Sequence, residues 1–227
     1  MSRKIVSIAA VLVVLSMAAA SLIAGSMLPA EVRLPVHWDL LGRPDRYADK
    51  WIALLAPAAT IGLVSLLFHF LPALEPRKEG LARSQGLYLW GWIGLLLMGG
   101  VIELALLSTA FNWGIPVIGL IVAGVGGLLV LIGNQLGKSR SMYLLGVRTP
   151  WTLVSEEVWI KTHRLCGKLM VIGGLVMLVS ALLPLPSGLL ATISAAVILV
   201  SAGIPIFYSF ILWRREVRSD RTHGSAG

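Results

Sequence analysis

The sequence is poor in charged residues. Asp, Glu, Lys and Arg make up only 13% of its 227 residues, whereas 57% are hydrophobic. A soluble domain carries roughly 25% charged residues, so this chain lacks the polar side chains needed to cover a surface that faces water. This scarcity of charge excludes a soluble enzyme.

Cysteine is scarce too, and common catalytic motifs are absent. Cys166 is the single cysteine, which excludes an intramolecular disulfide and a cysteine-based zinc cluster. The sequence has no HExxH zinc motif and no G-x-S-x-G nucleophile elbow. Gly137-Lys138-Ser139 resembles the end of a phosphate-binding loop, but Ile132 stands where that motif requires its first glycine. We therefore expect no catalytic residue, no metal and no cofactor.

Six long hydrophobic runs dominate the chain. A run of about 20 apolar residues spans the hydrocarbon core of a bilayer as a helix. The runs cover residues 5–28, 51–74, 87–111, 115–136, 169–185 and 189–213. They predict an all-α membrane protein, a bundle of six transmembrane helices built by a single polytopic domain, residues 1–227. The connections include a short extracytoplasmic loop element at 29–50 and a cytoplasmic motif loop at 137–168, which contains an amphipathic helix.

The positive charges lie mainly on one side of the predicted spans. The N-terminus, the second and fourth loops and the C-terminal tail hold 15 of the 19 Lys and Arg residues, and the loop at 29–50 holds the other four. The positive-inside rule assigns the richer side to the cytoplasm. We expect a plasma-membrane protein with both termini in the cytoplasm. The net charge of +8 is then a topology signal, and binding to nucleic acid is not expected.

The loop at 29–50 reads PAEVRLPVHWDLLGRPDRYADK, and turn chemistry divides it. Gly42 permits a positive φ and Pro44 presets its own φ, while hydrophobic residues alternate with others over 34–38. This pattern predicts a short extended element with a turn. His37 and Asp39 could act as metal ligands or as an acid–base pair, or they satisfy hydrogen bonds within a compact loop. Two polar groups without a third or fourth ligand favour the last interpretation.

The loop at 137–168 predicts a helix that runs into the fifth span. Pro150 ends any extension of the fourth span, and Ser155 is a plausible N-cap. Glu157 and Lys161 stand in the favourable i,i+4 order. A basic helix face at the membrane surface could simply meet anionic headgroups, but this leaves the tightly interleaved segment Gly146-Val147-Arg148-Thr149-Pro150-Trp151 unexplained.

An acid and a series of small residues stand out within the spans. Glu103 lies in the third span, where acids are costly and usually face the bundle interior. It is either a proton or cation site, or a protonated carboxyl bonded to a neighbour such as Ser108 or Asn112. Small residues at four-residue spacing favour close helix packing in lipid. They are Gly119, Ala123 and Gly127, and likewise Gly133 and Gly137.

Both loops resemble the SdpI family of bacterial toxin-immunity membrane proteins. The outer match is LPVHWDLLGRPDRYADKW, and the inner match is GN-x-x-GK at 133–138, followed by GVRTPWTL and W-x-x-THR. The resemblance implies a non-enzymatic plasma-membrane protein that protects its producer from a secreted, membrane-acting peptide toxin. It also implies a possible signalling role through a cytoplasmic transcriptional repressor, and contact with membrane lipid.

Two sets of residues follow as candidate sites, together with the intramembrane Glu103. The residues expected to bind a toxin or partner are His37, Trp38, Asp39, Gly42, Asp45 and Lys50. The residues expected to form the cytoplasmic motif are Asn134, Gly137, Lys138, Gly146, Arg148, Thr149, Pro150, Trp151, Trp159, Thr162, His163 and Arg164.

We expect the motif residues from Arg148 to Arg164 to cluster at the inner membrane boundary, with Arg148 beside aromatic rings. The alternative function is a small proton-coupled transporter or channel that uses Glu103. A third is an intramembrane enzyme built from Arg148, His163 and the polar groups of the loops.

Overall fold

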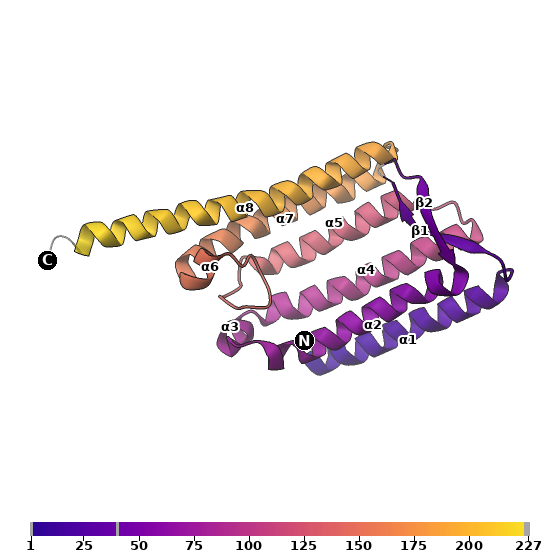
Figure 1. Ribbon diagram of the computed structural model, residues 1–227, viewed down its shortest axis with the longest axis horizontal. Coiled ribbons are helices and arrows are strands. Elements are labelled where there is room, and N and C mark those ends of the chain that lie inside the picture. Colours follow the sequence, from indigo (N-terminus) through magenta and orange to yellow (C-terminus); the bar gives the residue numbers. More distant parts are fainter. Residues whose placement is uncertain (1, 40, 225–227) are drawn as a thin grey trace.

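The computed structural model describes residues 2–39 and 41–224, the last five of these as backbone only, and this part of the chain forms eight helices and one β-hairpin (Figure 1). In chain order, the elements are α1 (Arg3–Met27), β1 (Arg33–Trp38), β2 (Pro44–Asp49), α2 (Lys50–Leu74), α3 (Lys78–Arg83), α4 (Gln85–Phe111), α5 (Val117–Leu136), α6 (Pro150–Val154), α7 (Glu156–Leu182) and α8 (Ser187–Gly224).

Six of these helices are long and apolar enough to cross a membrane, namely α1, α2, α4, α5, α7 and α8. They lie side by side along the long axis of the molecule (Figure 1). Each packs on the next in that order, and α1 also contacts α4. The prediction of an all-α membrane protein with six spans is confirmed. We call the end that carries α3, α6 and residues 137–149 the motif end, and the opposite end, which carries β1 and β2, the hairpin end.

The helix boundaries extend two of the predicted spans. Residues 156–182 form one continuous helix, so the predicted amphipathic segment and most of the predicted fifth span belong to α7. Its N-cap is Ser155, as predicted, because the Ser155 side chain accepts a hydrogen bond from Val158 N. The predicted pair of Glu157 and Lys161 is present. Helix α8 runs on past residue 213 and extends well beyond the other helices at the motif end (Figure 1).

Helices α5 and α7 meet backbone to backbone at four glycines. A β-carbon on Gly133 would lie 2.8 Å from the carbonyl oxygen of Gly167, and one on Gly167 would lie 2.6 Å from that of Gly133. Gly126 and Gly174 face each other in the same way, at 2.8 Å and 2.5 Å. Such contacts leave no room for any side chain, and in lipid they supply close van der Waals packing. We call these four residues the glycine seam.

The predicted packing stripe at Gly119, Ala123 and Gly127 does not form one contact face, because Gly119 is buried against α7 whereas Gly127 lies off the face that carries the seam. A β-carbon on Gly127 would meet nothing within 4 Å, and one on Gly119 would have ordinary contacts at 3.6 Å or more. The sequence spacing alone does not show how α5 is rotated about its axis. Of the second predicted pair, Gly133 belongs to the seam.

At the hairpin end, β1 and β2 form the extended, turn-containing element that the sequence predicts. The strands are antiparallel, with Arg33 opposite Asp49 and Trp38 opposite Pro44, and the ladder is irregular near His37. Gly42 lies in the turn with φ +77°, a conformation that glycine adopts without steric cost.

Candidate functional site

Residues 137–149 are the part of the predicted loop that precedes α6, and from here on we call this part the motif loop. It is held in place by a buried carboxylate that follows α2. Glu75 is only 1% exposed. Its oxygens accept hydrogen bonds from the backbone N–H groups of Tyr143 at 3.0 and 3.1 Å, Leu144 at 2.8 Å and Arg77 at 2.9 Å. Hydrogen bonds to a charged group contribute more than neutral ones, about 1.5–3 kcal/mol each. Glu75 therefore ties the loop before α6 to the connection between α2 and α3.

Arg77 makes a second tie between the same segments. Its guanidinium donates to the hydroxyl of Ser141 and, at 2.9 Å, to the carbonyl oxygen of Leu153 in α6. The guanidinium carbon also lies 4.6 Å from the centroid of the Tyr143 ring. Planar stacking and several donors at once are what Arg offers and Lys does not.

A stacked pair of side chains in α7 forms the floor of the loop. The rings of Trp159 and His163 stack with centroids 3.9 Å apart, and both side chains are fully buried. His163 Nε2 accepts from the backbone N–H of Val147 at 2.8 Å, so Nδ1 must carry the hydrogen that is donated to Trp159 O at 2.8 Å. Trp159 Nε1 donates to Ser139 Oγ at 3.2 Å. Gly146 crosses this floor with φ +111°, where a β-carbon would lie 2.5 Å from His163 Nε2.

Helix α6 connects the loop to α8. Thr149 caps α6, since its hydroxyl accepts from the backbone N–H of Thr152, and the Thr152 side chain accepts from Thr149 N in return. Trp151 then donates from Nε1 to the hydroxyl of Ser209 in α8. Its ring stacks on Trp213 at a centroid distance of 6.1 Å. The long α8 is thereby attached to the motif loop.

Arg148 does not stack on aromatic rings, so that prediction is wrong. The exposed Arg148 donates to the carbonyl oxygen of Tyr143 at 2.8 Å, and it is Arg77 whose guanidinium lies over the Tyr143 ring. The neighbours of Arg148 explain this orientation. Val147 bonds inward to His163 and Thr149 caps α6, so the residue between them faces outward.

The other predicted motif residues divide between the interior and the surface. Thr162 is fully buried beside His163 on α7. Gly137 packs against α7, where a β-carbon would lie 3.5 Å from the Cα of Arg164. The side chains of Asn134, Lys138 and Arg164 are exposed. The predicted cluster therefore consists of a buried group around Trp159, an aromatic group around Trp151, and charges directed outward.

An enzyme built on His163 and Arg148 is disfavoured by this geometry. Both ring nitrogens of His163 are occupied, and the side chain is 0% exposed, so a substrate has no access to it. Arg148 faces away from it. Among the described residues, no group of three His, Cys, Asp or Glu side chains is placed to hold a metal ion.

At the hairpin end, Asp39 organises the turn. Its Oδ1 accepts from the backbone N–H groups of Leu41 and Arg43, each at 2.8 Å, and Oδ2 accepts from Arg43 Nε at 3.1 Å. The backbone hydrogen bond from Arg43 lowers the pKa of Asp39 below its ordinary value. His37 instead contacts Asp45, with Nδ1 and Oδ1 2.6 Å apart. His37 and Asp39 thus have separate partners, which supports the interpretation of a compact, internally bonded loop.

Lys50 joins the hairpin to α1. It is buried, and its Nζ donates to the carbonyl oxygen of Leu28 at 2.6 Å, which satisfies an unpaired carbonyl at the end of α1. It also lies 5.3 Å from the centroid of the Trp51 ring. Lys50 is therefore a structural anchor of the hairpin.

Trp38 lines two cavities under the hairpin. The first, about 260 Å³, is almost wholly apolar and opens between α2, α4 and α5. Its lining residues are Val36, Trp38, Ala53, Ala56, Pro57, Thr60, Ile61, Ile102, Ala105, Leu106 and Ile121. The second, about 480 Å³, lies toward the loops that join α4 to α5 and α7 to α8, where Ser108, Thr109 and Asn112 add polar groups. We call the first cavity the apolar groove, and its lining suits a hydrophobic or amphipathic ligand.

Glu103 faces the bundle interior, as predicted, but its partner is neither Ser108 nor Asn112. The Glu103 side chain is 5% exposed, and its Oε1 lies 2.7 Å from Ser21 Oγ, which also lies 2.7 Å from Leu54 O. A hydroxyl has one hydrogen to donate, and a carbonyl can only accept. When Ser21 donates to Leu54, the contact with Glu103 requires a hydrogen on the carboxyl. Through Ser21, Glu103 thus ties α4 to α1 and α2.

Glu103→Gln is expected to preserve the protein, because the amide can still donate to Ser21. Glu103→Ala removes the bond and should lower the free energy of unfolding by about 2 kcal/mol. Thermal unfolding of the purified variants in detergent measures both effects. If the protein were a proton-coupled transporter, Glu103→Gln would lose activity in a functional assay although its stability is normal.

Sequence reasoning missed the ties that Glu75, Arg77, Ser139 and Ser209 provide. A signal for two of them is present: Glu75-Pro76-Arg77 places an acid and an arginine around a proline directly after an apolar run. From the sequence, the basic residues of that loop indicate only the topology. The roles of Ser139 and Ser209 depend on contacts with residues 20 and 58 positions away, which no local pattern reveals.

Comparison with known proteins finds matches for two segments of the sequence. Residues 138–209 match the family model described as the SdpI/YfhL protein family, and residues 12–61 match a domain of unknown function, DUF1648. The Immunity protein SdpI of Bacillus subtilis (strain 168) is 26% identical over 178 residues, which cover 78% of this chain and 80% of that protein. No solved structure matches the chain significantly.

Proposed function

This chain is a relative of the SdpI/YfhL family, as its motifs predict, and from that premise we propose that it is an SdpI-like immunity protein. It gives its host resistance to a secreted peptide toxin that acts on the membrane. The observation that supports this most is the match to Immunity protein SdpI, which covers 78% of this chain. The protein acts by binding, without catalysis.

We propose that the motif end faces the cytoplasm and the hairpin end faces outward. The distribution of Lys and Arg supports this orientation, since 15 of the 19 lie in the segments assigned to the inner side. The hairpin end would then meet a toxin that arrives from outside. A signalling role would use the opposite end, where α8 projects past the other helices as a surface for a cytoplasmic repressor (Figure 1).

The toxin site in this proposal is the apolar groove under Trp38. The groove lies between α2, α4 and α5 and is lined by β-branched and other aliphatic side chains. A toxin segment that lies in the outer leaflet could enter it laterally, with Trp38 as the aromatic anchor. Buried aromatic anchors of this kind supply a large share of binding free energy at interfaces.

Trp38→Ala tests the proposal in a host strain from which the gene has been deleted. Survival is measured in conditioned medium from the undeleted strain, at matched membrane levels of each variant. Loss of an anchor worth about 2 kcal/mol should weaken toxin binding about thirtyfold and should shift the protective dose accordingly.

Trp113→Ala is the matched control, because Trp113 is an exposed aromatic side chain at the same end that lines neither cavity. It should protect like the unmodified protein. Equal survival of Trp38→Ala and the unmodified protein would refute the groove as the toxin site. Equal survival of the deletion strain would refute the immunity function itself.

A further inference from the structure

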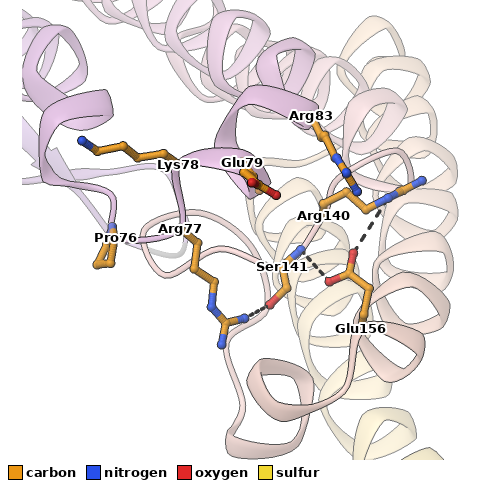
Figure 2. A pocket seen from close by; sticks show the side chains of 9 residues that line it. Pro76, Arg77, Lys78, Glu79, Arg83, Arg140, Ser141 and Glu156 are labelled. Carbon is orange, nitrogen blue, oxygen red and sulfur yellow. Dashed lines mark hydrogen bonds and ion pairs between the residues drawn. The ribbon is translucent and has the colours of Figure 1, made fainter.

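A basic cavity of about 480 Å³ opens at the motif end, between α3 and the motif loop (Figure 2). Its charged lining residues are Arg77, Lys78, Glu79, Arg83, Arg140 and Glu156, a formal excess of two positive charges. The volume falls within the range of about 300–1,000 Å³ that is usual for ligand sites. The cavity is separate from the groove under Trp38, at the other end of the bundle.

The cations around this cavity differ in how far the protein already uses them. Arg77 is engaged by Ser141 and Leu153. Arg140 donates to the carbonyl oxygen of Ser139 at 3.2 Å and lies 3.8 Å from Glu156, a loose ion pair. No hydrogen bond or ion pair engages the exposed Arg83 within the described part of the chain. In Figure 2, Arg83 and Arg140 extend toward the same side of the cavity, which leaves guanidinium donors available there.

The wall of the cavity next to Arg140 is closely packed. A β-carbon on Gly80 of α3 would lie 2.1 Å from the carbonyl oxygen of Ser141, so α3 rests directly on the motif loop. Glu156 Oε2 accepts from the backbone N–H of Ser141 at 3.2 Å. One wall of the cavity is thus built from preformed contacts, and Arg83 extends from α3 beside it.

The cavity lies at one end of the apolar helices. Helix α3 connects the end of α2 to the start of α4, both of which are membrane spans. Two residues before Glu156 of the lining, the apolar side chain of Val154 in α6 is 76% exposed. An apolar side chain exposed beside a ring of cations is typical of the interface, where apolar groups meet acyl chains and cations meet headgroups.

We propose that this cavity is a binding site for the phosphate group of an anionic phospholipid, held by Arg83 and Arg140. The planar fork of an arginine matches phosphate oxygens with two parallel hydrogen bonds, which makes Arg more selective than a diffuse positive surface. A bound headgroup would bridge α3 to the start of the motif loop. A soluble phosphate compound shares this chemistry, and the test distinguishes the two sources.

The test is native mass spectrometry of the purified full chain in neutral detergent, titrated with phosphatidylglycerol, phosphatidylcholine or inorganic phosphate. The unmodified protein is expected to retain phosphatidylglycerol in preference to phosphatidylcholine. Arg83→Gln should weaken this binding about fivefold and Arg83→Gln/Arg140→Gln about twentyfold or more, because each change removes a charge-assisted bond. Glu79→Gln removes a carboxylate from the wall and should strengthen binding about twofold.

Arg3→Gln is the matched control, since Arg3 is an exposed arginine at the same end that does not line the cavity. It should bind phosphatidylglycerol like the unmodified protein. Displacement of the lipid by inorganic phosphate would overturn the lipid as the ligand. The site would then bind a soluble phosphate compound through Arg83. Equal weakening by Arg3→Gln and Arg83→Gln, or no weakening by either, would overturn the proposal and leave only diffuse headgroup attraction.

Discussion

Replacement of Glu75 by Gln is expected to release the motif loop. Gln has one carbonyl oxygen in place of two carboxylate oxygens, and its NH₂ group would face the backbone N–H donors of Tyr143 and Arg77 or those of Tyr143 and Leu144. Two hydrogen bonds to a buried carboxylate are lost, at a cost of about 3 kcal/mol or more. The population of the opened loop should then rise by about two orders of magnitude. Loss of the loop should also abolish protection in the survival assay.

Limited trypsin digestion measures this opening, because the cleavage sites Arg140 and Arg148 flank Tyr143 and Leu144, the loop residues that Glu75 holds. Cleavage after both residues, identified by mass spectrometry, should be faster in Glu75→Gln by about the same factor as the open population. Glu157→Gln makes the same chemical change at the same end and removes an exposed pair with Lys161. Its cleavage rate should stay within about threefold. Unchanged cleavage in Glu75→Gln would refute the role assigned to Glu75.

Gly133→Val is expected to separate α5 from α7. A β-carbon at this position would lie 2.8 Å from the carbonyl oxygen of Gly167, and the obstacle is backbone, which has no rotamer to change. Overpacking of a core costs about 1–3 kcal/mol when side chains can shift, so this cost should be larger. Little folded protein is expected to survive extraction.

Size-exclusion chromatography of a fluorescent fusion in mild detergent measures the outcome as the fraction in the monodisperse peak after heating. Gly127→Val is the control, because it adds the same β-branched side chain to the same helix. At Gly127 an added β-carbon would meet no atom of a neighbouring element within 4 Å. It should keep the peak close to that of the unmodified protein. If Gly127→Val and Gly133→Val are equally damaging, helix propensity rather than the glycine seam explains the loss.

Features that depend on one short stretch of chain could be predicted from the sequence. The six spans follow from the length of the apolar runs, and the hairpin turn follows from Gly42 and Pro44. The cap at Ser155 follows from a hydroxyl placed before an acidic first turn. Each of these depends on residues within one run or one turn, so no partner helix had to be known.

The tertiary structure alone decided which faces of the helices meet. Every face of these spans is apolar, so hydrophobic periodicity does not distinguish the buried side as it does in water. That is why Gly126 and Gly133 form the seam while Gly127 lies off it, and why Ser21 is the partner of Glu103 across 82 positions. Glu75 could be identified as the anchor of the motif loop only in the folded chain, because its donors lie 68 and 69 residues away. Contacts of this kind depend on helix rotation and on the return of distant segments to one end of the bundle, and neither is encoded in any local pattern.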